Sequence, residues 1–293
     1  MDTIMGMVKS DLALEAAETL GEGLDKIPGL RKVESLREGY AVTSITVENQ
    51  RAAEALGKPE GRYITVDLRP YFQRRSHYFP RGVRCLRREI WDLLPDMRED
   101  DTVLVAGLGN GTLLCDAVGP MALESLLVTR HMLDLLPCRS QHFTSVAALA
   151  TGVVGQTGIE TVELLQGVVA HIRPAAVIAI DALTARSRQR LCATVQISST
   201  GLVPGSGVGN HRQAIDQETL GVPVLAVGVP TVMAGAELAR EMTGAAPRTS
   251  DDLFVTSRDI DSRVRELSRL VGYGVTSALQ PLLTVDDITG LLG

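Results

Sequence analysis

Three short apolar runs constrain the fold of this chain more than any other feature. They occupy residues 102–106, 175–180 and 223–229, are rich in valine, isoleucine, leucine and alanine, and are bounded by turn residues. Because successive positions in each run are apolar, both faces of the strand that it forms must be buried. Such strands lie inside a sheet that is covered on both sides. The sequence therefore predicts an α/β fold in three layers, with a mainly parallel central sheet flanked by helices.

One covering helix can be located between two of these runs. Thr157 and Glu160 have the spacing of a capping box, which satisfies free amides at a helix start. Apolar residues then recur at helical spacing up to residue 172, and Pro174 ends the segment before the next strand. The length alone would fit one large domain or two small ones. The repeated order of strand, helix and strand favours a single α/β domain over residues 1–293.

Charge and cysteine content exclude several classes of function. The chain has 35 acidic and 29 basic residues mixed along its length, and no run of lysine or arginine suits a nucleic acid backbone. No apolar run approaches the roughly 20 residues that span a bilayer. The four cysteines form no CxxC pair, and the five histidines show no metal-ligand spacing. We expect a cytoplasmic protein with no nucleic acid or membrane partner and no metal or other cofactor.

Two aspartates follow different predicted strands. Asp181 comes directly after the run at 175–180, and Asp116 lies further along the chain from the run at 102–106. Because catalytic groups gather at the carboxyl ends of parallel strands, the two side chains can converge. Two close carboxylates cannot both ionise cheaply, so one activates water while the protonated one polarises a peptide carbonyl. The alternative is that each aspartate only caps the helix after its strand.

Glycine-rich segments at 107–110 and 205–210 follow two strand-like stretches. Neither completes the dinucleotide-binding GxGxxG pattern, because a residue other than glycine stands at the third glycine position. The segments are therefore either turns that need a positive φ or loops whose amides hold a substrate carbonyl or an oxyanion. The substrate-binding or oxyanion residues of the second interpretation are Gly109, Asn110, Gly205, Ser206 and Gly207.

Nucleophilic catalysis has weaker support in the sequence. Cys115 adjoins Asp116, but no histidine stands at a position that would activate it. Ser206 lies in Gly-Ser-Gly and lacks the Gly-x-Ser-x-Gly pattern of a nucleophile elbow. Neither residue is expected to attack a substrate.

Several stretches of the chain closely resemble the spore germination proteases of endospore-forming bacteria. They occur in that family's order and cover the chain from about residue 10 to about residue 240, with a long and specific block at 177–231. They include Ser10-Asp-Leu-Ala-Leu-Glu-Ala16, Asp116-Ala-Val-Gly-Pro120, Ala179-Ile-Asp-Ala-Leu183 and Pro204-Gly-Ser-Gly-Val-Gly-Asn210.

The resemblance implies an unusual peptidase, distinct from pepsin-like enzymes, with a fold similar to that of the hydrogenase maturation proteases. It implies that Asp116 and Asp181 are the catalytic residues and that the enzyme is a homotetramer. The implied substrates are small acid-soluble spore proteins, degraded during germination in the cytoplasm of the forespore and spore. It also implies a proenzyme that trims its own N-terminus ahead of Asp11, so that residues 1–10 would form a short propeptide or leader.

Two other classes of protein remain open. A metal-sensing peptidase of the hydrogenase-maturation type would need a histidine and two carboxylates at the sheet edge. A non-catalytic nucleotide-binding module would use the glycine-rich loops alone. Metal-independent cleavage of a spore protein would exclude the first class, and failure to bind nucleotides would exclude the second.

Overall fold

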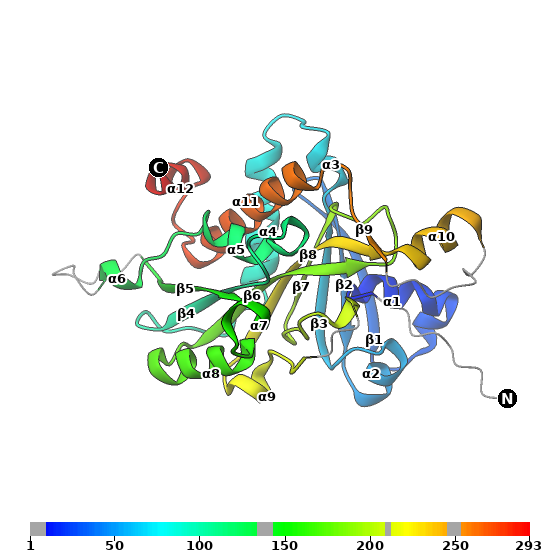
Figure 1. The fold of residues 1–293 in the computed structure, drawn as a ribbon, viewed down its shortest axis with the longest axis horizontal. Helices are drawn as coiled ribbons and strands as arrows, with labels where there is room; N and C mark the ends of the chain where they lie inside the picture. The colour runs from blue at the N-terminus through cyan, green and yellow to red at the C-terminus, as the bar shows by residue number, and fades with distance from the viewer. Residues whose placement is uncertain (1–9, 134–142, 209–211, 245–252) are drawn as a thin grey trace.

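The central sheet has nine strands within the described residues (Figure 1). The computed structural model describes residues 10–133, 143–208, 212–244 and 253–293. The strand order is β1-β2-β3-β7-β8-β6-β4-β5, and β9 pairs with the end of β8. The strands are β1 (Leu30–Arg37), β2 (Tyr40–Val47), β3 (Gly61–Asp67), β4 (Thr102–Leu108), β5 (Ser145–Gly152), β6 (Ala176–Ala185), β7 (Thr194–Ser198), β8 (Val224–Ala234) and β9 (Phe254–Val255).

Helices pack on both faces of this sheet, so the predicted three-layer α/β class is confirmed. No helix in the described ranges combines the length and the apolar character needed to cross a bilayer. The α-helices are α1 (Ala13–Leu20), α2 (Gln50–Leu56), α3 (Arg69–Phe72), α4 (Tyr78–Trp91), α5 (Val118–Leu123), α6 (Arg130–Leu133), α7 (Val154–Thr157), α8 (Thr161–Ile172), α9 (Gln217–Leu220), α10 (Gly235–Thr243), α11 (Ile260–Leu279) and α12 (Val285–Leu292). Three short 3-10 helices are η1 (Gly21–Lys26), η2 (Leu114–Asp116) and η3 (Ser206–Val208).

The sheet is mixed rather than mainly parallel, which corrects the prediction in this detail. Strands β8, β6, β4 and β5 are parallel to one another. Strands β1, β2, β3 and β7 pair antiparallel, and β7 joins β8 in the same way. The three apolar runs of the sequence are β4, β6 and β8, so they describe only the parallel part of the sheet.

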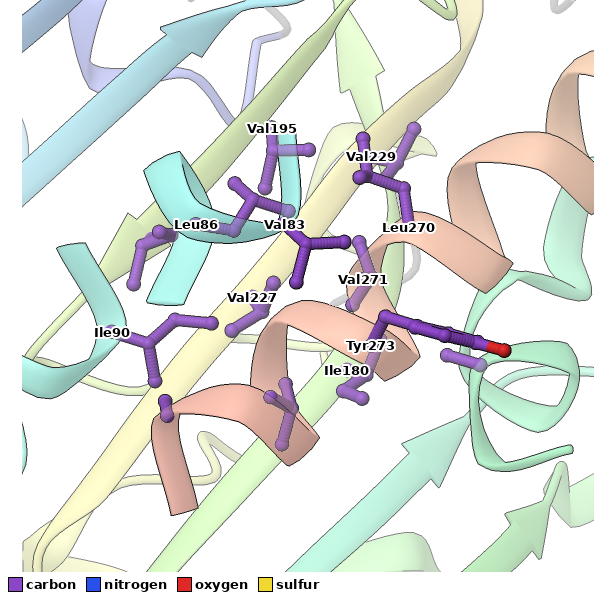
Figure 2. Packing of buried hydrophobic residues seen from close by; sticks show 14 of the residues in the cluster. Val83, Leu86, Ile90, Ile180, Val195, Val227, Val229, Leu270, Val271 and Tyr273 are labelled. Atoms are coloured by element: carbon purple, nitrogen blue, oxygen red, sulfur yellow. The ribbon is translucent and has the colours of Figure 1, made fainter. Parts of the chain in front are cut away.

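Alternate side chains of the buried strands enter two different cores. Ile178 and Ile180 of β6 belong to the core under α4, α5 and α11, whereas Val177 and Ala179 belong to the core under α8. This alternation explains why the run is apolar at every position. Figure 2 shows the first core, in which the side chains of α4 and α11 meet those of β6, β7 and β8. The labelled residues are Val83, Leu86, Ile90, Ile180, Val195, Val227, Val229, Leu270, Val271 and Tyr273.

The second face of the sheet is covered in two parts. Helices α8 and α9 pack over the parallel strands, and α1 and α2 pack over β1, β2 and β3. Leu12, just before α1, packs separately against Leu183 and Ala185 at the end of β6. The start of the described chain therefore lies against the strand that carries Asp181.

One local prediction fails for an identifiable reason. Gly158 adopts a left-handed conformation and ends α7, so Thr157 closes one helix instead of capping the next. The following helix, α8, begins at Thr161, and its N-cap residue Glu160 makes no side-chain cap hydrogen bond. The predicted capping box is therefore wrong, although the apolar face of α8 is as expected.

Candidate active site

A cavity of about 320 Å³ opens where β4 and β5 end and β6 and β8 pass beside them. Its lining is partly apolar and includes residues from all four parallel strands. The charged residues that line it are Asp11, Asp116, Asp181 and Arg212. The structure thus brings both predicted aspartates to one site and adds two charged groups that the sequence did not indicate.

Asp181 lies inside β6 rather than after it. The strand continues to Ala185 because its pairing with β8 extends past the predicted end. The Asp181 side chain is only 6% exposed, and its Oδ1 accepts a hydrogen bond from the Ala182 N–H at 2.9 Å. Burial, followed by the negative charge of Asp116, raises its pKa well above the usual value. A strand interior also excludes the helix-capping alternative for this residue.

Asp116 lies at the end of η2 and is held by the backbone of the preceding glycine loop. The N–H of Asn110 donates to its Oδ2 at 2.8 Å. Gly109 allows this contact because its φ is +99° and a Cβ there would lie 2.1 Å from the Asp116 carbonyl oxygen. Burial raises the pKa of Asp116, while the Asn110 hydrogen bond and the charge of Arg212 oppose that rise.

Close backbone packing places the Asp116 turn against the sheet. Gly119 is the second residue of α5, and a Cβ at this position would lie 2.3 Å from the carbonyl oxygen of Leu108 and 2.5 Å from that of Ile180. Gly107 of β4 is packed as tightly, with the Gly119 carbonyl oxygen 2.6 Å from its ideal Cβ position. These contacts let η2 sit at the ends of β4 and β6, beside Asp181.

The five loop residues named in the sequence take different positions. Gly109, Gly205 and Gly207 line the cavity, whereas Asn110 and Ser206 lie behind it as hydrogen-bonding supports. The Oδ1 of Asn110 accepts from the N–H of Thr112 at 2.9 Å and from Nε2 of Gln156 at 2.8 Å. The backbone N–H of Asn110 already donates to Asp116, so the role of Asn110 is to position this carboxylate.

Asp11 joins the start of the described chain to the site, although no pattern in the sequence marked it as a site residue. Its Oδ1 accepts from the Ser206 hydroxyl at 2.6 Å, and its Oδ2 accepts from the Thr184 N–H at 2.8 Å. Its backbone N–H donates to the Thr184 carbonyl at 3.1 Å. Asp11 therefore ties the loop that contains Gly205 and Gly207 to β6, three residues beyond Asp181. The only sequence signal was its place in the stretch that begins at Ser10.

Arg212 supplies a positive charge to a cavity with three carboxylates. It follows the glycine-rich loop and precedes Ile215, which is bridged to Leu202. Its charge lowers the pKa of both Asp116 and Asp181, against the dominant effect of burial. In the sequence, Arg212 stands where the third glycine of a GxGxxG pattern starting at Gly207 would be, and nothing else pointed to it.

Replacing Arg212 with glutamine is expected to raise the pKa of both aspartates and to move to higher pH any activity that depends on their protonation. The arginine charge favours the ionised form of both aspartates, so its loss raises both pKa values. A carboxylate that acts as a base would then ionise at higher pH, and one that acts as an acid would keep its proton to higher pH. Both limbs of the profile of kcat/KM against pH should shift in the alkaline direction.

Arg212→Lys is the matched control, because it keeps the charge and should keep the profile near that of the wild type. A merely structural arginine would give a lower rate with unmoved limbs in Arg212→Gln. That result would contradict the electrostatic role.

Cys115 also lines the cavity but is poorly suited to be a nucleophile. Burial, followed by the charge of Asp116, raises the pKa of its thiol. A thiol in that environment stays protonated at neutral pH, whereas reactive cysteines have lowered pKa values. The Cys115 carbonyl is fixed by the Thr231 hydroxyl, which donates to it at 2.5 Å.

A cavity at the carboxyl ends of the parallel strands of an α/β sheet is the usual place for an enzyme's active site. The family model described as germination protease matches residues 7–244. A germination protease of Caldanaerobacter subterraneus subsp. tengcongensis is 36% identical, over 97% of this chain and 98% of its own length. One from Clostridium perfringens is 34% identical over 97% and 99%, and one from Bacillus cereus is 40% identical over 77% and 63%.

The protein is therefore a peptidase, a hydrolase of peptide bonds. It belongs to the germination protease family, as the resemblance of its motifs predicted.

Proposed function

We propose that this chain is an endopeptidase that degrades small acid-soluble spore proteins during germination, using water activated by Asp116 and Asp181. The observation that carries the proposal is the convergence of these two carboxylates on one cavity of a germination protease. Burial raises the pKa of each, and the charge of Asp116 adds to the rise at Asp181. A pair of this kind shares one proton near neutral pH.

The surroundings suggest a different role for each aspartate. Asp181 is the more deeply buried, so it holds the proton and donates a hydrogen bond to the carbonyl oxygen of the scissile peptide. Asp116 is ionised, because the Asn110 N–H stabilises its negative charge, and it removes a proton from the attacking water. The water oxygen bonds to the carbonyl carbon. Collapse of the tetrahedral intermediate breaks the C–N bond as the proton on Asp116 passes to the leaving amine.

The loop that contains Gly205 and Gly207 is suited to hold the substrate backbone. Both glycines line the cavity, and Asp11 fixes the loop through Ser206. A Cβ at Gly207 would lie 2.4 Å from Thr184 Oγ1 and 2.5 Å from Asp11 Oδ2, so glycine allows the loop to lie directly on β6. Backbone amides held in this way can stabilise the oxyanion that forms on the peptide carbonyl.

Apolar side chains around the cavity fit a polypeptide substrate. Leu113, Val203 and Phe254 line the cavity and are 52%, 38% and 36% exposed. They come from three separate parts of the chain, and burying them against apolar substrate residues would favour binding. A nucleotide-binding module would instead require phosphate-binding groups, and the three carboxylates of this cavity repel phosphate.

Purified protein is expected to cleave a small acid-soluble spore protein in the presence of a chelator and after treatment with a thiol reagent. The Cys115 thiol is protonated, and the proposed chemistry needs only the aspartates and water. Cleavage is read by gel electrophoresis and mass spectrometry of the fragments. Cys115→Ala is the control and should keep activity within about a factor of two to three, the usual range for a residue outside the chemistry.

Complete loss of cleavage with the chelator, restored by added metal, would support the metal-sensing class instead. If the thiol reagent inactivates the protein stoichiometrically, and Cys115→Ala is resistant to it, Cys115 would be the nucleophile.

The proposal includes a homotetramer in the spore cytoplasm and maturation by loss of the residues ahead of Asp11. Residues 1–9 of the expected leader lie outside the described residues, and the chain enters the site at Ser10 and Asp11. A truncated chain that starts at Asp11 is expected to keep the hydrogen bonds of the Asp11 side chain and to cleave at least as fast as the full chain. Intact mass and activity after incubation of the full chain measure its self-processing. A full chain that is active and never loses these residues would contradict the maturation step. The homotetramer is tested separately, by sedimentation of the purified protein.

A further inference from the structure

Strand β5 forms one end of the sheet, and its outer edge is open in the described part of the chain (Figure 1). Side chains on both of its faces pack against the cores, although Ala150 is exposed. Ala147 and Leu149 pack into the core under α8, and Ala148 packs against the core on the opposite side. The strand is therefore fixed in position by its faces, while only its edge remains without a neighbouring strand.

The outward hydrogen-bonding groups of β5 can be assigned from one contact. Thr129 binds Val146 from outside the sheet, with the Thr129 N–H donating to the Val146 carbonyl at 3.1 Å and the Val146 N–H donating to Thr129 Oγ1 at 2.9 Å. In a strand, the N–H and C=O groups of every second residue point to the same side. Ala148 and Ala150 therefore direct theirs outward, and neither makes a hydrogen bond on that side to any described residue.

The opposite edge of the sheet differs in chemistry. Strand β1 carries Arg31, Lys32, Glu34 and Arg37, and charged residues of this kind prevent an edge from pairing with other strands. β5 has the sequence Ser-Val-Ala-Ala-Leu-Ala-Thr-Gly, with no charged residue and no proline. One edge is protected against strand addition, and the other is not.

The open edge leads directly into the candidate active site. Gly152, the last residue of β5, and Val153 both line the cavity that contains Asp116 and Asp181. Strand order places β4 between β5 and β6, so a strand added to β5 lies three strand spacings from β6, about 14 Å. An extended chain covers that distance in about four residues.

We infer that β5 is the docking edge for the polypeptide substrate, which adds to Ala148 and Ala150 as an extra β-strand before it crosses into the cavity. The occupant is an extended segment of the substrate protein, because backbone hydrogen bonds to an edge strand do not depend on a particular side chain. The inference rests on the proposed active site between Asp116 and Asp181. It adds a binding region for substrate residues about four or more positions from the cleaved bond.

A synthetic peptide series tests this without altering the protein fold. The cleavage site on a small acid-soluble spore protein is first mapped by mass spectrometry, and a long peptide is made around it. Single backbone N-methyl groups then remove one N–H at a time along the peptide. Beyond about four residues from the cleaved bond, we expect kcat/KM to fall about three- to tenfold at alternate positions on one side. An effect without this alternation, or none at all, would overturn the inference.

Ala148→Pro tests the protein side of the same contact. Proline removes the outward N–H of Ala148, which is not part of the ladder with β4. The control, Ala148→Ser, keeps the N–H at the same site. Ala148→Pro is expected to raise KM about three- to tenfold for the long peptide, whereas both variants should cleave a short peptide that fills only the cavity at the wild-type rate. Equal loss on both peptides would contradict a role confined to the edge.

Two further measurements separate this inference from other outcomes. Binding of the labelled long peptide to the Asp181→Asn protein, followed by fluorescence anisotropy, reports on the edge whether or not the aspartate mechanism is correct. N-methyl groups should weaken this binding with the same alternation. If Ala148→Pro instead dissociates the oligomer in sedimentation and leaves cleavage of the long peptide unchanged, the edge pairs with a second copy of the chain and the inference fails.

Discussion

Asp116→Asn and Asp181→Asn are each expected to abolish cleavage, with kcat lowered by at least about 10³-fold. In the proposed mechanism, the first change removes the base that takes a proton from water, and the second removes the acid that binds the peptide carbonyl oxygen. Since the two groups act as one unit, the double variant should be little slower than either single variant. Turnover of a small acid-soluble spore protein, followed by mass spectrometry, measures the loss. Near-normal turnover in either variant would rule out the paired mechanism.

The same variants provide their own control for folding. A carboxyl whose pKa is higher in the folded state than in the unfolded state holds its proton more tightly when the protein is folded. The free energy of unfolding therefore falls as the pH rises from the unfolded pKa toward the folded pKa. The pKa of Asp181 is raised in this direction, and asparagine carries no ionisable group. The Oδ1 of asparagine can still accept from the Ala182 N–H. At neutral pH, Asp181→Asn should therefore melt at or above the wild-type temperature, which would separate lost chemistry from lost structure.

Gly119→Ala is expected to lower the free energy of unfolding by about 1–3 kcal/mol or more and to reduce activity about 10²-fold. The added methyl group would lie 2.3–2.5 Å from backbone atoms of Leu108 and Ile180, which cannot move aside as a side chain can. Relief of the clash requires α5 to shift, and η2 with Asp116 precedes that helix directly. Urea denaturation and kcat/KM measure the two effects.

Gly167→Ala is the matched control for this substitution. Gly167 lies in the exposed part of α8, and nothing approaches within 4 Å of its ideal Cβ position. Alanine there should stabilise the protein by about 0.5–1 kcal/mol and leave activity unchanged. If Gly119→Ala behaves like Gly167→Ala, the close packing of α5 on the sheet does not position Asp116.

The elements predicted most accurately from the sequence are those with an apolar pattern set by neighbouring residues. The runs that became β4, β6 and β8 are apolar on both faces, and this pattern depends only on neighbouring residues. β1 was not predicted because its charged residues give no apolar alternation, as suits an edge strand. β5 was not predicted because three of its eight residues are alanine, which favours strands only weakly.

The candidate site could be predicted only where a residue follows a strand. Asp116 and Asp181 were identified from that position, although β6 continues past Asp181 through pairing with β8 that no local pattern shows. Asp11 reaches the site through contacts with Thr184 and Ser206, which lie more than 170 residues away in the chain. Contacts at such separations are formed by the tertiary fold, so the hydrogen bonds of Asp11 could be found only in the structure.

The two aspartates are held by parts of the fold that differ in their resistance to opening. Asp181 lies in β6, which pairs with β8 at this residue and with β4 up to Ile180, so its amide is expected to exchange slowly with solvent. Asp116 lies in a short 3-10 turn beside an exposed loop, whose hydrogen bonds can break in a local fluctuation. Mild denaturant can therefore separate the carboxylates while the sheet remains intact. Inactivation is then expected to precede unfolding, because the hydrogen bonds that hold Asp116 open more easily than those of the sheet.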